Sequence, residues 1–310
     1  MSNKPEIIQQ RDELVNKVFD MFDKNVPYEL RLRDAIINEL VVPFHYYGVR
    51  DKLVDYGLNK SQERKLIAQL GSEEHCSFII NEIEKHRSNS KLKALAFCRN
   101  ITHARMMSES LSSQYKTAYL TGKNNIGERV RAYNDLQDDN NELEILFTVD
   151  ILNEGVDIPG VNMVLFLRPT DSSTVFIQQL GRGLRKYDNK PYVTVLDFIG
   201  NSYKRSVQVA FALGSLSTNF VMEKRLMSLV HDNFNALGLN EYGVQVHIDD
   251  LSKEEIIQYL ESENFNKSEY LKQDYFNFKK YINCETYPKH MDYLNNDCAP
   301  DLMRFLQVSQ

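Results

Sequence analysis

The chain has 310 residues, of which 42% are hydrophobic and 26% are charged, and its formal net charge is −6. This composition excludes an intrinsically disordered chain and is typical of a globular protein with enough residues for two cores. No run of eighteen apolar residues occurs and residues 1–11 are polar, so we expect neither a membrane span nor a secretory signal, and we expect a cytoplasmic location.

Residues 12–23 have the pattern of a short amphipathic helix, and residues 26–32 that of an edge strand. Between residues 39 and 205, short β-rich runs alternate with amphipathic stretches, which predicts a parallel sheet covered by helices on both faces. The expected strands are residues 41–47, 92–97, 117–120, 143–147, 161–166 and 192–198. The expected helices between them are residues 73–86, 102–111, 127–136 and 172–180.

After about residue 205 the strand pattern fades and helical patterns follow. Residues 252–262 carry a Ser-x-x-Glu capping box at Ser252 and Glu255. We therefore expect a connector at residues 1–38, an α/β domain at 39–205 and a smaller, mostly α-helical accessory domain at 206–310. The Tyr- and Phe-rich tail of that last segment is interpreted as helix-packing core in preference to a base-stacking surface.

Charge differs along the chain. Lys and Arg exceed Asp and Glu by two in residues 89–205, whereas the flanking segments carry the net acidity. Because phosphate binding depends on local charge, the acidic total does not exclude a nucleic-acid partner. The four cysteines lack Cys-x-x-Cys spacing and the seven histidines lack ligand spacing, so we expect neither disulfides nor a metal site.

Polar residues follow three of the expected strands, where parallel sheets bind ligands. Arg99 and Asn100 follow residues 92–97, with Thr102 as the expected N-cap of the next helix. Thr148 follows residues 143–147 and begins a turn that contains Gly155 and Asp157. A glycine lets the backbone approach a ligand closely, and an aspartate accepts hydrogen bonds from ribose hydroxyls.

The strand at 161–166 leads to a helix with Gln178 near its end, followed by Gly181, Arg182, Gly183 and Arg185 on a glycine-hinged loop. Two guanidinium groups in this spacing suit a nucleoside triphosphate, because they stay protonated and stabilise charge on the γ-phosphate. Taken alone, the pair is also explained by complementing the dipole at a helix C-terminus. Asp157 alone is equally explained as a turn residue before Pro159.

These motifs together resemble the second RecA-like domain of superfamily 2 helicases and translocases. Residues 178–185 resemble the arginine-finger motif, residues 148–157 the motif before it, and residues 95–100 and 120–123 two strand-contacting motifs. The Gln-x-x-Gly-Arg-x-x-Arg form is closer to restriction-type and repair-type DNA motors than to the RNA-dedicated DEAD-box group. Residues 26–48 also resemble the linker that joins the two motor domains in bacterial members.

The resemblance implies a RecA-like α/β fold and a role for each matching residue. It makes Arg182 and Arg185 the fingers that reach the γ-phosphate of ATP, with Gly155, Asp157 and Gln178 also at the ATP side. It makes the following residues contacts of a nucleic-acid backbone: Arg99, Asn100, Thr121, Gly122 and Thr148. No Gly-x-x-x-x-Gly-Lys-Ser/Thr loop occurs in the chain, so Mg²⁺ would be held mainly by a missing first motor domain.

The sequence therefore predicts the C-terminal motor lobe of an ATP-dependent DNA helicase or translocase, inactive as an ATPase alone. Its expected partners are DNA and an N-terminal RecA-like lobe, supplied in cis or in trans, and no membrane. The alternative is a non-catalytic module derived from such a lobe, which binds nucleic acid or docks a partner.

Overall fold

The computed structural model describes residues 32–55, 58, 60–88, 90–149, 158–168, 173–199, 212–213 and 223–262. The helix expected at 12–23 and the tail after residue 262 lie outside these residues. So does the strand expected at 26–32, except for Leu32, which begins the helix α2 (Leu32–Ile37).

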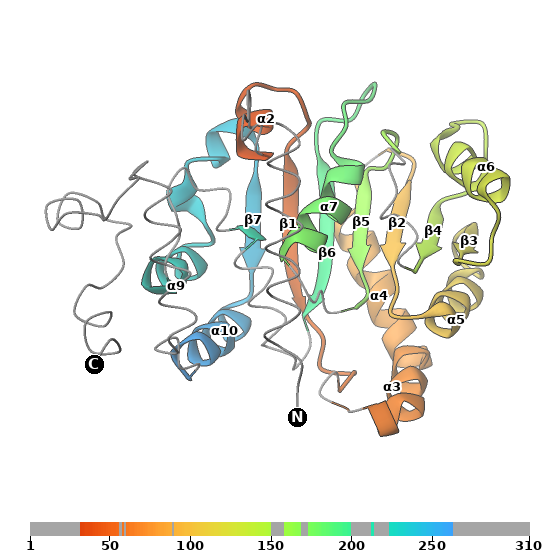
Figure 1. The fold of residues 1–310 in the computed structure, drawn as a ribbon, viewed down its shortest axis with the longest axis horizontal. Helices are drawn as coiled ribbons and strands as arrows, with labels where there is room; N and C mark the ends of the chain where they lie inside the picture. Colours follow the sequence, from red (N-terminus) through yellow and green to blue (C-terminus); the bar gives the residue numbers. More distant parts are fainter. Residues whose placement is uncertain are drawn as a thin grey trace, which may run out of the picture.

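The described residues form a seven-stranded sheet with the strand order β3-β4-β2-β5-β6-β1-β7 and parallel pairing throughout (Figure 1). All six strands expected between residues 39 and 205 are present. The strands are β1 (Phe44–Arg50), β2 (Ala94–Phe97), β3 (Thr117–Leu120), β4 (Ile145–Thr148), β5 (Met163–Phe166), β6 (Val193–Ile199) and β7 (Gln245–Ile248).

Strand β2 shows why the runs are continuously apolar. Leu95 and Phe97 point into one hydrophobic core, whereas Ala94 and Ala96 point into a second core on the other face. Because side chains alternate between the faces of a strand, a strand that is covered on both faces needs apolar residues at every position.

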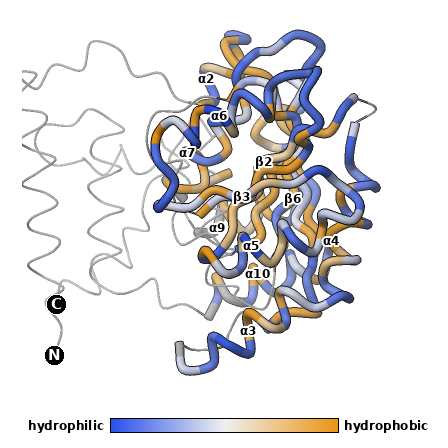
Figure 2. Tube along the Cα trace, turned by 90° about the vertical axis from the view of Figure 1, so that its right-hand side faces the viewer, coloured by the Kyte–Doolittle hydropathy of each residue, from blue (hydrophilic) through white to orange (hydrophobic). Residues whose placement is uncertain are grey.

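Helices cover both faces of the sheet, and Figure 2 shows α4 and α7 on opposite sides of it. Helices α4 (Glu73–His86) and α5 (Ile101–Leu111) pack into the core that contains Ala94 and Ala96. Side chains of α6, α7, α9 and α10 belong to the core that contains Leu95 and Phe97. The remaining bounds are η1 (Lys60–Gln62), α3 (Glu63–Leu70), α6 (Ile126–Gln137), α7 (Ser173–Gly183), α9 (Glu223–His231), η3 (Asn235–Leu237), η4 (Asn240–Tyr242) and α10 (Asp250–Ser262).

Two expected helix caps are wrong. The N-cap of α5 is Asn100 instead of Thr102, because the Asn100 side chain accepts the main-chain N–H of His103 at 2.9 Å. Helix α10 begins before Ser252, whose main-chain N–H donates to Asp249 Oδ1 at 3.0 Å. Ser252 is fully buried inside the first turn, so the expected capping box with Glu255 does not form. Glu255 instead forms an ion pair with Arg50 at 2.6 Å.

Strand β7 was not among the expected strands and lies in the segment after residue 205, which was expected to be mostly α-helical. It pairs with β1, with Tyr47 opposite His247. Leu226 of α9 and Ile256 of α10 lie in the same core as Phe44 of β1. Within the described residues, the chain after residue 205 therefore completes the sheet and one of its cores, while the boundary at 205 stays a prediction.

Two of the four cysteines, Cys76 and Cys98, lie in the described residues as buried free thiols. Burial raises the pKa of Cys98 far above its ordinary value, so this thiol behaves as a small hydrophobic side chain, as expected. Among the described residues, no helix has both the length and the hydropathy needed to cross a bilayer.

Candidate functional site

Arg182 and Arg185 lie at the carboxyl end of α7, at the edge of the sheet where the strands begin. A Cβ atom on Gly183 would lie 3.3 Å from Val164 Cγ2 and 3.6 Å from Val193 Cγ1, which places this end of α7 against the first residues of β5 and β6. Arg182 is half-buried and Arg185 is exposed. Two permanent positive charges therefore lie at the amino edge of the sheet.

The prediction of a glycine-hinged loop at residues 181–185 is wrong for residues 181–183. Gly181, Arg182 and Gly183 form the last turn of α7. Gly183 is needed for the close approach of the helix to the sheet, whereas a Cβ atom on Gly181 would meet nothing within 4 Å. Arg182 occupies the last turn, where a cation also complements the helix dipole. The structure is thus compatible with both interpretations of the arginine pair.

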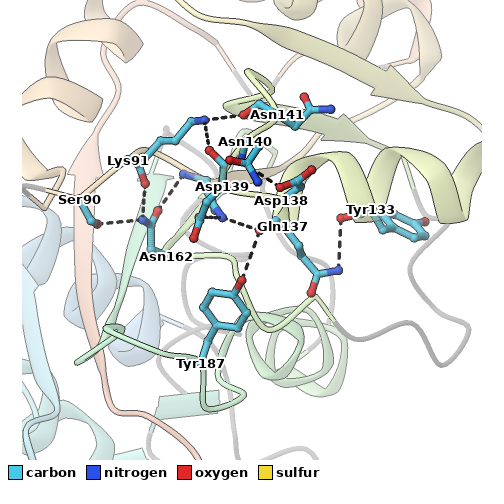
Figure 3. A network of polar contacts seen from close by, with 11 residues as sticks. Ser90, Lys91, Tyr133, Gln137, Asp138, Asp139, Asn140, Asn141, Asn162 and Tyr187 are labelled. Carbon is cyan, nitrogen blue, oxygen red and sulfur yellow. Dashed lines mark hydrogen bonds and ion pairs between the residues drawn. The ribbon is translucent and has the colours of Figure 1, made fainter.

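A polar network holds the elements around this amino edge together (Figure 3). The main-chain oxygen of Gln137, at the end of α6, accepts from Lys93 Nζ at 2.5 Å and from the Tyr187 hydroxyl at 3.4 Å. Asn162, just before β5, accepts the main-chain N–H of Lys93 at 3.0 Å and donates to the main-chain oxygen of Lys91 at 2.7 Å. These hydrogen bonds connect the end of α6 and the beginnings of β2 and β5 to Tyr187, in the segment that follows Arg185.

Of the other residues expected at ATP, only Gln178 is described, and its side chain is exposed on α7. Its neighbour Gln179 is buried, and within the part of the chain that the structure describes its Oε1 atom has no hydrogen-bond partner. Burial raises the pKa of Tyr133 on α6, and the positive charges of Arg129 and Arg182 oppose this shift. The charge of Arg182 therefore acts on the neighbouring helix. Gly155 and Asp157 lie outside the described residues.

Arg99 and Asn100 form the turn between β2 and α5, at the edge of the sheet where the strands end. Besides capping α5, Asn100 donates from Nδ2 to Glu63 Oε1 at 3.1 Å. The main-chain N–H of Arg99 donates to His103 Nδ1 at 3.3 Å. Both side chains are partly exposed. Glu63 and His103 thus hold the turn in place, while the side chains of Arg99 and Asn100 stay accessible to solvent.

His103 is a residue that the sequence analysis missed. Its side chain is fully buried, and desolvation lowers its pKa to about 3, so the ring is neutral near pH 7. Since Nδ1 accepts the Arg99 N–H, the proton lies on Nε2, which has no hydrogen-bond partner among the described residues. One sequence signal could have identified His103. It lies three residues after the N-cap Asn100, a position from which its side chain can reach back to the turn.

Thr121 and Gly122 form the turn after β3. Thr121 is buried, and its main-chain N–H and hydroxyl both donate to Asn124 Oδ1, at 2.8 and 3.2 Å. Arg129, which the sequence analysis also missed, donates to the main-chain oxygens of Asn124 and Gly122 at 3.0 and 3.1 Å. The Thr121 side chain is thus used within the turn, whereas Gly122 is exposed.

Thr148 ends β4 and is fully buried, with its hydroxyl donating to the main-chain oxygen of Ala96 at 3.4 Å. The structure therefore brings Arg99, Asn100, Thr121, Gly122 and Thr148 to one edge of the sheet, where the parallel strands β2, β3 and β4 end. It separates them from Arg182 and Arg185 at the opposite edge. The contact roles of all these residues stay predictions.

Comparison with known proteins gives a specific match. Residues 54–187 match the model of the helicase conserved C-terminal domain. The chain is 40% identical over 75 residues to the putative ATP-dependent helicase IRC3 of Saccharomyces cerevisiae, covering 24% of this chain and 11% of that protein. It is 25% identical over 215 residues to UvrABC system protein B of Caldicellulosiruptor bescii, covering 66% of this chain and 29% of that protein.

Among solved structures, the fragment of a putative HsdR subunit of a type I restriction enzyme from Vibrio vulnificus is similar, with a TM-score of 0.49 and 20% identity. The match covers 61% of this chain and 38% of that one. The chain spans less than a third of the length of the two curated relatives.

Proposed function

Because residues 54–187 belong to the helicase conserved C-terminal domain of superfamily 2 helicases, we propose that this chain is the C-terminal motor lobe of an ATP-dependent DNA helicase or translocase. In this proposal the chain supplies arginine fingers and nucleic-acid contacts, and it is not an ATPase alone. The observation that carries the proposal is the placement of two arginines at the amino edge of the sheet, away from the strand-end turns that would contact DNA.

Arg182 and Arg185 fit the phosphates of ATP. Both guanidinium groups stay protonated at any working pH, and they are held at the end of a packed helix, so they need little reorganisation to meet developing negative charge. ATP supplies the γ-phosphoryl group that is transferred to water. The chain's own part would be to stabilise the charge on that group with Arg182 and Arg185, while Gly155, Asp157 and Gln178 contribute at the same side.

The fit is incomplete without a second lobe. The sequence contains no loop of the Gly-x-x-x-x-Gly-Lys-Ser/Thr type, and such loops cradle the phosphates and hold Mg²⁺ through their Ser or Thr. The proposal therefore needs a first RecA-like lobe, in cis or in trans, that binds ATP and Mg²⁺ and faces the arginines across a cleft.

DNA is proposed to bind at the opposite edge of the sheet. The turn at Arg99 and Asn100 offers a partly exposed cation beside the N-terminus of α5, a combination that suits a backbone phosphate. Gly122 offers an accessible main chain, and Thr121 and Thr148 would support the two turns. We propose DNA in preference to RNA because of the Gln-x-x-Gly-Arg-x-x-Arg form, and we propose a cytoplasmic location.

The test compares DNA-stimulated ATP hydrolysis by the chain supplied with a first lobe, with and without Arg182→Ala and Arg185→Ala. We expect each substitution to lower the rate by about 10³-fold or more. Arg105→Ala is the matched control, since Arg105 is exposed on α5 and pairs with Glu109 at 3.9 Å, and we expect it to leave the rate unchanged.

Equal rates for the arginine variants and the unsubstituted protein would refute the motor lobe. A normal motor rate from the 310-residue chain alone would also refute it. DNA binding without any ATPase activity in the two-lobe protein would support the alternative, a non-catalytic module that binds nucleic acid or docks a partner.

A further inference from the structure

Lys190 lies in the segment that leads from α7 to β6, and its side chain is only 8% exposed. Its ammonium group donates to three main-chain oxygens: Gly183 at 2.8 Å, Val161 at 3.3 Å, and Pro159 in a shorter contact. An ammonium group has three donors, so all the hydrogen-bonding capacity of Lys190 is directed at backbone.

This environment is unusual for a lysine. In the described part of the chain, no carboxylate forms an ion pair with Lys190, and desolvation lowers its pKa to about 8. Buried charges are costly unless they are paired or hydrogen-bonded. Three carbonyl dipoles, one of them at the negative end of the α7 dipole, take the place of a counter-ion. A surface lysine would avoid this burial, so its cost indicates that the position of the ammonium group matters.

The three oxygens belong to two elements that the proposed function uses. Gly183 directly follows Arg182 at the end of α7. Pro159 and Val161 lie on the turn before β5, two and four residues after Asp157. The ammonium group of Lys190 therefore connects the end of α7, which carries Arg182, to the turn that follows Asp157, the residue proposed to contact the ribose.

Further contacts hold the end of α7 and the turn before β5 in place. The main-chain N–H of Val42 donates to the oxygen of Leu184 at 2.8 Å, which fixes the chain just past α7. In the turn, a Cβ atom on Gly160 would lie 3.3 Å from Gln137 Cα, so the turn packs directly under the end of α6. Tyr187 reaches the same end of α6 (Figure 3). Lys190 thus connects the end of α7 to a turn that is itself packed against α6.

From this arrangement we infer that Lys190 is a positioning residue: its ammonium group fixes the carboxyl end of α7, and thereby Arg182, relative to the turn that follows Asp157. The inference rests on the proposed function. Loss of the ammonium group leaves the three carbonyl oxygens, two of them on buried residues, without this donor, so the last turn of α7 loosens. Since transition-state contacts depend on placement to within about 1 Å, Arg182 would then stabilise the transferred phosphoryl group less well.

The first experiment is a double-mutant cycle on the ATPase activity of the chain supplied with a first lobe. We expect Lys190→Met to lower kcat by about tenfold or more with a change in the KM for ATP of about twofold or less. In the Arg182→Ala background, Lys190→Met should cause no further loss, because it acts through Arg182. Lys190→Arg, which keeps the charge and the donors, should restore part of the rate.

Lys93→Met is the matched control. Lys93 is a second buried lysine at the same edge. Its ammonium group contacts the main-chain oxygen of Gln137, the carboxylate of Asp139 and the face of the Tyr187 ring, and among the described residues it donates no hydrogen bond to α7. We expect this variant to lose stability and keep kcat. An unchanged kcat in Lys190→Met, or an independent further loss in the Arg182→Ala background, would overturn the inference.

A second experiment uses the 310-residue chain alone and needs no ATPase activity. Amide hydrogen exchange at Leu184 and Val42 reports the end of α7, because both amides are hydrogen-bonded there. We expect Lys190→Met to raise their exchange by about tenfold or more, and Lys93→Met to leave it unchanged. Unchanged exchange in Lys190→Met overturns the inference, whereas an Arg182→Ala variant with normal ATPase activity overturns the proposed function instead.

Discussion

The hydroxyl of Tyr46 donates a 2.7 Å hydrogen bond to Asp197 Oδ2, which joins β1 to β6 inside the core. Burial raises the pKa of Asp197 to about 7, and the hydrogen bond from Tyr46 opposes that shift. In an unfolded chain the same carboxyl has a pKa of about 3.9. The folded state therefore prefers the neutral carboxyl.

This preference predicts a pH-dependent stability. The folded pKa lies above the unfolded one, so the contribution is fully present below about pH 4 and is lost as pH rises through about 7. Asp197→Asn keeps an acceptor for Tyr46 and cannot ionise. We expect its stability, relative to that of the unsubstituted chain, to rise by at most about 3 kcal/mol from pH 5 to pH 8. Urea unfolding across this pH range measures the difference. Parallel stability curves for the two proteins would contradict the prediction.

Asn100 allows its structural and its proposed binding roles to be separated. Asn100→Ala removes the N-cap of α5 and should cost about 0.5–2 kcal/mol of stability while weakening DNA binding. Asn100→Asp keeps the capping oxygen but loses the donor to Glu63 and adds a negative charge beside it, so we expect a loss of stability of similar size and at least as large a loss of DNA affinity. Denaturant unfolding and fluorescence anisotropy with labelled DNA measure the two effects.

Ser72→Ala is the control for this comparison. Ser72 caps α4 by accepting the main-chain N–H of His75 at 3.2 Å, and it is not one of the residues proposed to contact DNA. It should lower stability by a similar amount and leave DNA affinity unchanged. If Asn100→Asp bound DNA normally, Asn100 would be only a cap.

Arg99 is expected to act on a phosphate. Arg99→Ala should weaken DNA binding similarly for all sequences and reduce the slope of log affinity against log salt by about 0.7–0.9. Titrations with several unrelated DNA sequences at a series of salt concentrations test this. The exposed Arg105, on the flank of α5, serves as the control for removing one positive charge. An unchanged slope in Arg99→Ala would remove Arg99 from the interface.

Gly181 offers a test of whether the last turn of α7 must bend. A Cβ atom there meets no neighbour, so Gly181→Ala should raise stability by up to about 1 kcal/mol. In Gly183→Ala the same helical gain is offset by contacts of 3.3 and 3.4 Å with Val164 and Val161. Thermal unfolding compares the two variants. A more stable Gly181→Ala protein with lower two-lobe ATPase activity would show that this turn moves during the cycle, and a destabilised one would contradict the helical conformation.

The central sheet was predictable because β2 and β5 are apolar at every position, β4 is apolar up to its last residue Thr148, and polar turns bound these strands. Strand β7 was not, since its outward residues Gln245 and His247 are exposed and leave no apolar run to recognise. Its place in the sheet comes from pairing with β1, a contact between residues about 200 positions apart that local pattern does not encode.

The motif residues of the candidate site could be predicted from the sequence, but the buried residues that hold them in place could not. Asn100 and Arg182 were identified from their places after expected strands and helices and from the resemblance to known motifs, whereas the residues that hold them, His103 and Lys190, are a buried histidine and a buried lysine. Lysine is rarely found in protein interiors, so composition alone assigns such a residue to the surface. The caps at Asn100 and Asp249 were missed because a second capping residue, Thr102 or Ser252, lies within three positions.

The position of β7 also bears on where this protein can be divided. A chain ended at residue 205, after the last of the motifs, would leave β1 as an exposed edge strand with its main-chain hydrogen-bonding groups unpaired on one side. It would also uncover the part of the core that Leu226 and Ile256 fill. Unpaired edges and exposed apolar surface favour aggregation, so the smallest piece with a complete sheet ends no earlier than Ile248.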